Sequence, residues 1–442
     1  MTELAGWGRY PRHETELLAP APEALPAILA ERSGLVVRGN GRAYGDAAIG
    51  ERLTLASRRL DRMRRFDPAT GLLTVEAGVL LAEVIDAFLP RGFFPAVVPG
   101  TRLVTVGGMI AADVHGKNHH RDGGFGDHVA SFRLALPGGA VVTCSAEENA
   151  ELFAATIGGM GLTGAILEAT IRLRPVETGW LRQQTTVAPD LDAAMAALAA
   201  AAGATYSVAW IDGLARGAAL GRSLVYTAEH ATRAELTGAA ARDPLPRARG
   251  GRLAVPLDAP GWGLNRWSVR AFNEVYYRKG AAAAGTARLV PWEPYFFPLD
   301  GIRDWNRIYG RRGFLQHQCV IPTAAAREAL GEILERVARR GSASFLAVLK
   351  QLGPGRRPLS FPLEGYTLAV DLPASPENLA LLGEVDRVVV AAGGRLYLAK
   401  DARQARETFE AGYPDLPAFR ALRRAVGAEE RIASRLSRRL GL

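Results

Sequence analysis

Three glycine-rich segments limit what this chain of 442 residues can fold into. They are RGNGRAYGD (38–46), GTRLVTVGGMIAADVHGKNHHRDGGFG (100–126) and GGMGLTG (158–164). Glycine is costly to order, so a chain keeps it where the backbone must turn with positive φ or lie against another group. Backbone N–H groups in such turns bind anions, and a bare backbone lets a flat ring approach. Ordinary turns explain any one segment, whereas a large dinucleotide lying along all three explains them together.

Two familiar nucleotide-binding loops do not fit these segments. A Rossmann loop needs G-x-G-x-x-G at the start of a helix. Gly39 and Gly41 fit that pattern, but Tyr44 stands at the third place and no helical pattern follows. A Walker A loop needs a glycine five positions before its Gly-Lys-Ser/Thr. The segment AADVHGKN (111–118) has alanine at the first place and asparagine at the last, so the spacing excludes both loops.

Composition narrows the class of protein. Hydrophobic residues make up 48% of the 442 residues, which is typical of a folded globular protein and predicts two domains. Two cysteines, Cys144 and Cys319, exclude a disulfide framework and any multi-cysteine metal or iron–sulfur site. Residues 1–18 carry charges where a secretion signal needs an apolar segment, and no stretch is apolar enough to span a bilayer. We therefore expect a cytoplasmic protein.

The net charge of +9 indicates either an anionic partner or only the arginine-rich composition of a GC-rich genome. Basic residues cluster at 242–252 and 420–439, but neither cluster has the interleaved aromatic residues that stack on bases. We therefore expect no nucleic-acid partner. An acidic lipid surface fits the same charge, so we expect peripheral contact with the inner face of a membrane.

The hydrophobic pattern predicts an α+β protein without the long βαβ repeat of a doubly wound sheet. In the first part it predicts helices at 22–32 and 80–92, strands at 34–37 and 72–78, and a hairpin at 131–145. Further on it predicts helices at 190–202, 323–341 and 376–392 and strands at 205–212, 314–322, 345–353 and 365–373. Strands separated by helices favour an antiparallel sheet with helices on one face. The Pro-, Arg- and Gly-rich segment 230–262 is expected to be a mobile loop.

Five motifs resemble the FAD domain (PCMH type) of the vanillyl-alcohol-oxidase type flavoproteins. They are RGNGRAYGD (38–46), PGTRLVTVGGMIAADVHGKNHH (99–120), FGDHV (125–129), ELFAATIGGMGLTGAI (151–166) and GGRLYLAKD (393–401). Within that family, HGKNHH followed by FGDHV, and later DWNRIYGRRGFLQHQCVIP (304–322), resemble the subfamily of decaprenylphosphoryl-β-D-ribose 2'-oxidases. The likeness implies an FAD-binding domain at 1–180 and a substrate-binding domain with an antiparallel sheet at 181–392. A C-terminal segment at 393–442 would return to the FAD domain.

The resemblance also implies which residues bind FAD. It places the pyrophosphate against Arg38, Gly39, Asn40, Gly41, Arg42, Ala43, Tyr44, Gly45, Asp46 and Ala47, with Gly100, Thr105, Val106, Gly107 and Gly108. It places His115, Gly116, Lys117 and Asn118 beside the flavin, and Ile166 and Tyr397 against other parts of the FAD. Many members of the larger superfamily carry a flavin-bonded histidine in the first glycine-rich segment. Arg42 stands at that position, so the FAD is expected to be non-covalent.

The implied sugar pocket is lined by Tyr44, Trp210, Gln316, Gln318, Lys350 and Lys400. Lys400 would lie at the N1/C2=O edge of the flavin, where a cation stabilises the charge left by reduction. Without the family context, Lys400 would be interpreted as a surface lysine paired with Asp401. Oxidation of a hydroxyl also needs a base for its proton. His115, Lys400 and Tyr44 are the three candidates for that base, and the sequence leaves the choice open.

The implied reaction is the oxidation of a secondary sugar hydroxyl to a ketone. The substrate would be the 2'-hydroxyl of a polyprenylphosphoryl-β-D-ribose, and a separate NAD(P)H-dependent short-chain reductase would complete an epimerisation. Quinone or oxygen would take the electrons. Thr367 and Ala369 stand where mycobacterial relatives carry asparagine and a cysteine attacked by covalent inhibitors, so this wall of the pocket differs. A free sugar or alditol is therefore the alternative substrate.

A metal hydrolase is the main rival interpretation. Four of the seven histidines lie at 115, 119, 120 and 128, and His115 with His119 would form an H-x3-H pair. Such a pair needs a helix to bring residues i and i+4 to one face. Gly116 and Asn118 make a poor helix, so we expect no metal site.

Overall fold

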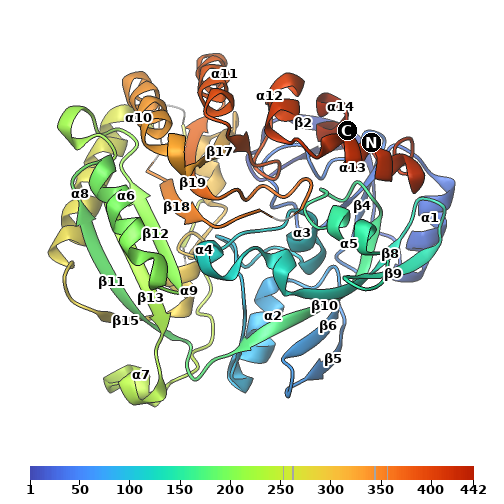
Figure 1. Cartoon of the computed structure of the whole chain (residues 1–442), viewed down its shortest axis with the longest axis horizontal. Helices are drawn as coiled ribbons and strands as arrows, with labels where there is room; N and C mark the ends of the chain where they lie inside the picture. Colours follow the sequence, from blue (N-terminus) through green and yellow to red (C-terminus); the bar gives the residue numbers. More distant parts are fainter. Residues whose placement is uncertain (252, 261–262, 343–344, 356) are drawn as a thin grey trace.

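The computed structural model describes residues 1–442 except 252, 261–262, 343–344 and 356 (Figure 1). Two sheets built from the N-terminal part of the chain lie beside one larger sheet built from the middle. The two ends of the chain lie close together at one side of the molecule in Figure 1. Helices combined with largely antiparallel sheets confirm the predicted α+β class.

The N-terminal part contains a four-stranded and a six-stranded sheet. The first has the order β1 (Thr2–Ala5), β2 (Arg12–Leu18), β4 (Leu53–Ala56), β3 (Leu35–Arg38). The second has the order β5 (Met63–Asp67), β6 (Leu72–Glu76), β10 (Ala165–Pro175), β8 (Val129–Ala135), β9 (Val141–Ser145), with β7 (Phe93–Pro95) paired to β10. Its helices are α1 (Leu25–Glu31), α2 (Leu81–Phe88), α3 (Val106–Ala111), α4 (His119–Asp122) and α5 (Ala150–Thr156).

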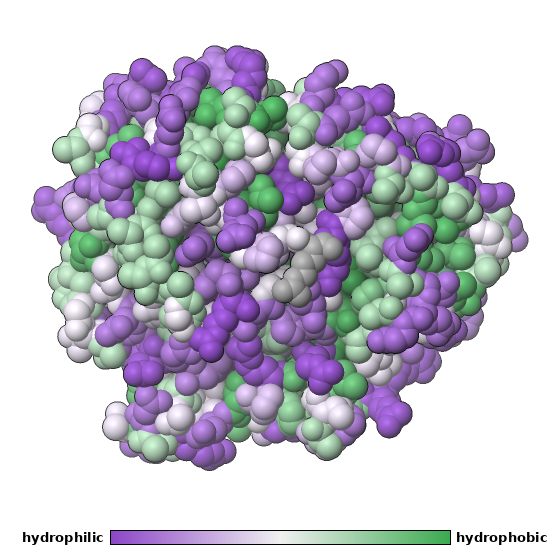
Figure 2. Space-filling model, viewed as in Figure 1, coloured by the Kyte–Doolittle hydropathy of each residue, from purple (hydrophilic) through white to green (hydrophobic). Residues whose placement is uncertain are grey.

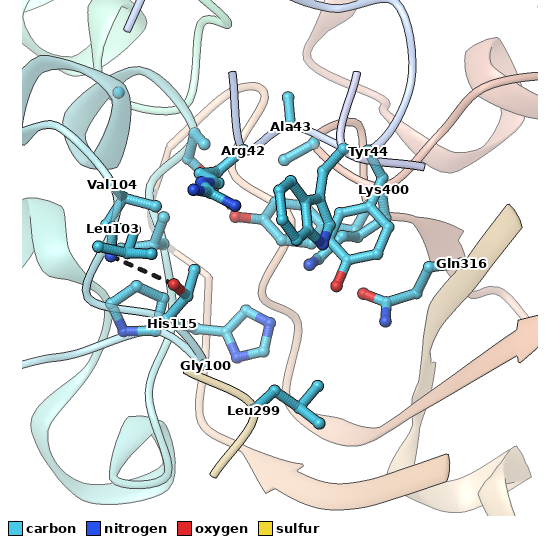
Figure 3. A pocket seen from close by; sticks show the side chains of 18 of the residues that line it. Arg42, Ala43, Tyr44, Gly100, Leu103, Val104, His115, Leu299, Gln316 and Lys400 are labelled. Carbon is cyan, nitrogen blue, oxygen red and sulfur yellow. Dashed lines mark hydrogen bonds between the residues drawn. The ribbon is translucent and has the colours of Figure 1, made fainter. Parts of the chain in front are cut away.

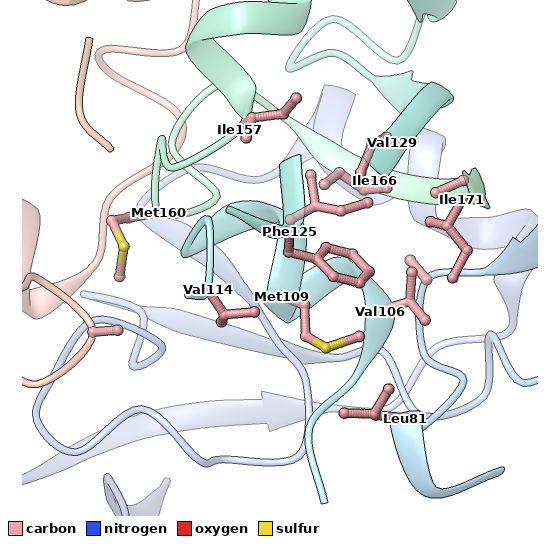
Figure 4. Close-up of a cluster of buried hydrophobic side chains, with 14 of the residues drawn as sticks. Leu81, Val106, Met109, Val114, Phe125, Val129, Ile157, Met160, Ile166 and Ile171 are labelled. Atoms are coloured by element: carbon pink, nitrogen blue, oxygen red, sulfur yellow. The ribbon is translucent and has the colours of Figure 1, made fainter. Parts of the chain in front are cut away.

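Apolar side chains from α3 and its neighbours hold the glycine-rich segments in place (Figure 4). Val106 and Met109 of α3 are fully buried together with Leu81 of α2 and Ile171 of β10. Burial of each such side chain contributes about 1.5–3 kcal/mol. Because α3 is anchored in this way, the second glycine-rich segment is fixed on both sides of the helix.

The middle of the chain forms an eight-stranded antiparallel sheet. Its order is β15 (Arg288–Pro291), β11 (Trp180–Ala188), β13 (Ser223–His230), β12 (Tyr206–Ile211), β18 (Ala347–Leu352), β19 (Gly365–Pro373), β17 (Phe314–Pro322), β20 (Arg395–Leu396). Helices α6 (Leu191–Ala200), α8 (Arg266–Ala282), α10 (Thr323–Arg340) and α11 (Pro376–Ala391) cover one face. Leu315, Cys319 and Ile321 of β17 point into that helical layer. Since side chains alternate along a strand, the residues between them point to the opposite face.

The last helices of the chain return to the N-terminal part. They are α12 (Arg406–Gly412), α13 (Leu416–Ala425) and α14 (Arg435–Leu440). Phe409, Phe419 and Leu436 from these helices share one buried cluster with Leu53 of β4. The N-terminal sheets and the end of the chain therefore form one continuous core.

The structure differs from the sequence-based expectations in three places. Segment 100–126 is not all loop, because it contains α3 and α4. Strands β11 and β13 and helix α8 were not predicted. Part of the expected loop 230–262 is regular, with α7 (Gly238–Arg242) and β14 (Leu253–Ala254), which pairs with β16 (Ile302–Arg303). Asp258 in this segment forms ion pairs with Arg9 and Arg307, and residues 252 and 261–262 lie outside the described residues.

Among the described residues, none of the helices combines the length and apolar character needed to cross a bilayer. Hydrophilic residues predominate on the face seen in Figure 2, and apolar residues form smaller groups between them.

A buried ion network joins the end of the chain to the first glycine-rich segment. Arg439 of α14 lies 2.9 Å from Asp46 and 2.9 Å from Asp401, and both carboxylates are almost completely buried. It also donates to the carbonyl oxygen of Gln404 at 2.9 Å. Desolvation and the two carboxylates act on the pKa of Arg439 in opposite directions, and the net effect raises it.

We predict that Arg439→Met lowers the free energy of unfolding by about 3–5 kcal/mol, because it leaves two buried carboxylates without a cation. The neighbouring Arg438→Met is the matched control, since Arg438 forms an exposed pair with Glu51. That variant should lose about 1 kcal/mol or less. Urea unfolding of the two variants measures the difference, and equal losses would contradict the assignment.

Candidate active site

A cavity of about 900 Å³ lies where the glycine-rich segments face the open side of the eight-stranded sheet (Figure 3). Most of the residues expected from the sequence line it. These are Gly39, Asn40, Gly41, Arg42, Ala43, Tyr44, Ala47, Gly100, Thr105, Gly107, Gly108, His115, Gly116, Lys117, Ile166, Trp210, Gln316, Gln318, Lys350, Tyr397 and Lys400. The fold therefore brings together residues from the N-terminal loops, the large sheet and the turn after β20.

Five of the expected cofactor residues do not line the cavity, and three of these belong to the first glycine-rich segment. Arg38 donates hydrogen bonds of 2.8 and 3.3 Å to backbone oxygens of two other segments. A Cβ at Gly45 would collide with the backbone of residues 401–402. Asp46 is paired with Arg439. These three residues do not line the cavity and instead hold the loop in position through contacts with other parts of the protein.

The other two residues belong to the second glycine-rich segment. Val106 is fully buried, and its N–H donates to the carbonyl oxygen of Val79 at 2.9 Å. The Asn118 side chain donates to the carbonyl oxygen of Ala96 at 2.8 Å and to the carboxylate of Asp122 at 2.7 Å. The Val106 N–H and the side-chain N–H groups of Asn118 are therefore used within the protein.

The first glycine-rich segment forms an anion cradle at one end of the cavity. The backbone N–H groups of residues 40–43 donate no hydrogen bond within the described chain. Gly41 has a φ of 64°, which favours glycine. A Cβ at Gly39 would collide with the hydroxyl of Thr105, which accepts a hydrogen bond from Gly108 N–H at 3.2 Å. The backbone of the first glycine-rich segment thus packs against the Thr105 side chain of the second and leaves a row of free donors.

The opposite wall of the cavity is the open face of the sheet. Gln316 and Gln318 of β17 alternate with the residues that face the helices, so both point into the cavity. Trp210 of β12 and Lys350 of β18 reach it for the same reason. Ala369 lies opposite Gln318 in the register of β17 and β19 and also lines this wall.

His115 lies at the centre of a polar network. Its Nδ1 is 3.2 Å from Lys350 Nζ, and its Nε2 is 2.9 Å from the side-chain amide of Gln318. That amide also lies 3.1 Å from the hydroxyl of Thr367. Burial, together with Lys350, lowers the pKa of His115 well below its usual value, so the ring is neutral. The amide nitrogen of Gln318 faces Nε2 and Lys350 Nζ faces Nδ1, so both ring nitrogens of His115 have a nitrogen partner.

Lys400 lies beside Tyr44, with its Nζ 3.7 Å from the centre of the ring (Figure 3). Burial lowers the pKa of Lys400 to about 7, although the nearby Asp371 opposes that shift. Burial raises the pKa of Tyr44 well above its usual value, so this phenol keeps its proton at neutral pH. Lys400 is thus the group of this pair that changes protonation near neutral pH.

Sequence reasoning missed Asp371 and Asp300. Asp371 is fully buried behind the cavity wall, accepts a hydrogen bond of 2.6 Å from Gln316, and has its pKa raised by burial to about 7. The sequence could have identified Asp371, because it lies two residues after Ala369 in the predicted strand 365–373. Asp300 accepts hydrogen bonds from Thr101 Oγ1 at 2.7 Å and from the N–H of Arg102 at 2.8 Å. No sequence pattern indicated that contact.

The metal-hydrolase interpretation finds no support in the described residues. They contain no group of three or more histidine, cysteine, aspartate or glutamate side chains placed to hold a metal ion. The rings of His115 and His119 are 6.3 Å apart. His119 Nδ1 accepts a hydrogen bond of 3.1 Å from the N–H of Gly353.

Comparison with known proteins agrees with this geometry. A family model described as an FAD binding domain matches residues 21–145. The chain is 38% identical over 450 residues to decaprenylphosphoryl-beta-D-ribose oxidase of Mycolicibacterium smegmatis, an alignment that covers 99% of this chain and 97% of the relative. The chain belongs to the FAD-linked oxidase family that includes this enzyme. Its cofactor is FAD, as the resemblance implied.

Two further relatives show how far the likeness extends. An uncharacterized protein of Streptomyces coelicolor is 38% identical over 382 residues, which is 82% of this chain and all 100% of the relative. L-gulonolactone oxidase of Bos taurus is 27% identical over 153 residues, or 35% of this chain and 34% of the relative. The second relative therefore matches only about a third of this oxidase.

The residues of the cavity fit FAD. The free N–H groups of residues 40–43 suit a pyrophosphate, and Gly107 and Gly108 line the cavity without a side chain. Lys117, Lys350 and Lys400 add positive charge in a largely desolvated space. An anionic dinucleotide offsets that charge.

Proposed function

We propose that this oxidase converts the 2'-hydroxyl of a polyprenylphosphoryl-β-D-ribose into a ketone. One observation carries the proposal: amide and ammonium groups adjoin aromatic rings on the sheet side of the cavity. Gln318 and Lys350 supply donors for sugar hydroxyls and a phosphate, and Trp210 and Tyr276 supply apolar surface for the first isoprene units. The full-length similarity to an enzyme named for a decaprenylphosphoryl ribose supports the same substrate class.

In this proposal, different parts of the chain bind the cofactor and the substrate. Residues 1–180 and the returning segment 393–442 would bind FAD, and residues 181–392 would bind the substrate. A second buried cluster, built almost entirely from residues 181–392, supports this division. The N–H groups of residues 40–43 would hold the pyrophosphate, while His115, Gly116 and Lys117 would lie beside the flavin. Ile166 and Tyr397 would contact other parts of the cofactor.

The FAD is held without a covalent bond in this proposal. Arg42 occupies the position of the linking histidine, and its guanidinium stacks on Trp7 at 3.9 Å. Among the described residues that line the cavity, His115 is the one histidine and none is a cysteine. His115 is already engaged by Lys350 and Gln318.

Acid precipitation of the yellow holoenzyme should therefore release the colour into the supernatant. The intact mass of the precipitated chain should equal that of the polypeptide alone. Colour that remains in the pellet, with a matching increase in mass, would show a covalent link.

Lys400 is the base that takes the hydroxyl proton in this proposal. Bound FAD supplies the acceptor for the hydride that leaves the same carbon. Of the three candidates, Tyr44 keeps its own proton, and both ring nitrogens of His115 face partners in the network. Lys400, with its pKa lowered to about 7, is substantially neutral at neutral pH and can accept a proton at Nζ.

A pH profile tests this role. Lys400 is protonated below its pKa and neutral above it, so substrate-dependent bleaching of the flavin should become faster as the pH rises through about 7. Lys400→Met should keep its flavin, lose about 10²–10⁴-fold in bleaching rate, and lose this pH dependence. Lys279→Met, at an exposed position on α8, is the control. A bleaching rate that falls as the pH rises through about 7 would instead show that Lys400 acts electrostatically, as a cation.

The product ketone needs a second enzyme to complete an epimerisation. A separate NAD(P)H-dependent short-chain reductase would supply that step, and quinone or oxygen would reoxidise the flavin. Because NAD(P)H is a cytoplasmic reductant, we place the oxidase in the cytoplasm, in contact with the inner face of the membrane.

Anaerobic mixing with farnesylphosphoryl ribose and with a panel of free alditols tests the substrate class. We expect the prenyl-phosphate sugar to bleach the flavin absorbance and the alditols to leave it unchanged, because alditols carry neither an isoprene chain for the aromatic wall nor a phosphate for Lys350. Bleaching by alditols alone would favour a sugar-alcohol oxidase.

A further inference from the structure

Exposed hydrophobic side chains are concentrated in one part of the chain. Of the ten large hydrophobic residues that are exposed in the described chain, six lie between Leu253 and Tyr276. Leu257, Trp267 and Val275 expose 74%, 63% and 67% of their surface. Single exposed apolar residues need no explanation, but a group of this size marks an interaction surface.

Helix α8 carries the centre of this surface, at the left edge of Figure 1. Its inner side is anchored, because Val269 is buried and Asn273 donates a hydrogen bond of 2.6 Å to Asp212. Trp267 and Val275 lie on its exposed side. The helix is therefore held firmly on the sheet while an apolar side remains in solvent.

A row of aromatic rings connects this helix with the cavity. Trp210 lines the cavity and lies 4.8 Å from Tyr276, which lies 5.8 Å from Phe272. Phe345 packs against Phe272 at 5.2 Å. Phe272 and Tyr276 both line the cavity and are exposed, at 45% and 37%, so the cavity opens beside α8.

Basic residues are concentrated in the same part of the chain. Residues 242–312 contain thirteen arginine or lysine residues and six aspartate or glutamate residues, so this region carries most of the net charge of +9. On α8 itself, Arg266, Arg270, Arg278 and Lys279 are exposed, and Glu274 is the only acidic residue. Basic residues beside exposed tryptophan and aliphatic side chains are typical of a protein surface that lies on an anionic bilayer.

We propose that the exposed side of α8, with the segment 253–257, docks on an anionic lipid bilayer and turns the cavity mouth toward it. The lipid chain of the substrate then enters along the row Phe272, Tyr276 and Trp210 without crossing water. This part rests on the proposed function, because it assumes a lipid-linked substrate. The docking itself depends only on the surface.

The charge of the surface argues for a bilayer over a second copy of the chain. Two copies meeting through α8 would bring like charges from both helices together, which opposes association. An anionic bilayer offsets that charge and also takes up the apolar side chains.

Sedimentation of the holoenzyme with lipid vesicles tests the docking surface. We expect binding to vesicles of equal parts phosphatidylglycerol and phosphatidylcholine, with little binding to pure phosphatidylcholine. The double variants Trp267→Ser/Val275→Ser and Arg270→Glu/Lys279→Glu should each bind at least tenfold more weakly. Leu17→Ser/Val141→Ser, which removes two exposed apolar residues elsewhere, at 40% and 37%, should bind like the wild type. Flavin content and thermal unfolding confirm that each variant is folded.

Two further measurements separate the possible failures. Farnesylphosphoryl ribose in solution should bleach the α8 variants at the wild-type rate, whereas a long-chain substrate in vesicles should bleach them at least tenfold more slowly. Absence of wild-type binding to the anionic vesicles, or equal binding by all variants, overturns the docking proposal. A wild-type dimer in light scattering that the α8 variants abolish would also overturn it in favour of a self-interface. If no prenyl-phosphate sugar bleaches the flavin, the proposed function fails while the vesicle result still stands.

Discussion

The close approach of backbone segments at the first glycine-rich loop is the constraint on which the rest of the site depends. Gly45 lies against the backbone of Asp401, and the N–H of Tyr44 donates to the carbonyl oxygen of Ala399 at 2.9 Å. This contact holds the Tyr44 ring beside Lys400. A side chain at position 45 would push the loop away from the turn that carries Lys400, so the cradle and the reactive lysine depend on the same packing.

Positive charge in a desolvated cavity is the second organising feature. Burial lowers the pKa of Lys117 to about 7, of Lys350 to about 8 and of Lys400 to about 7. A buried cation is costly unless an anion accompanies it. A bound dinucleotide or phosphate therefore favours the charged form of Lys117 and Lys350. Ligand binding and the protonation of the site are thus coupled, and this coupling follows from the shape of the cavity as much as from its residues.

Regular alternation made much of the large sheet predictable. Strands 314–322 and 365–373 have the predicted bounds, because proline ends both, and large apolar residues alternate along the second. Helix α8 was missed because its inner side is held by a polar contact from Asn273, which weakens the apolar period. Strand β11 was missed because one of its faces is rich in polar residues. Local pattern thus predicted the elements that bury apolar residues and failed where a polar contact or a polar face obscured the pattern.

The sequence by itself determined the family, the cofactor and the set of residues from which the cavity is built, because glycine spacing and strand alternation are local properties. Only the tertiary structure decided which of these residues face the cavity. Asp46 is turned away by Arg439, which lies 393 positions further along the chain. Asp371 gains its place through Gln316 on the neighbouring strand. In both cases the partner is distant in sequence, and the direction of a polar side chain depends on the partner that the fold brings to it.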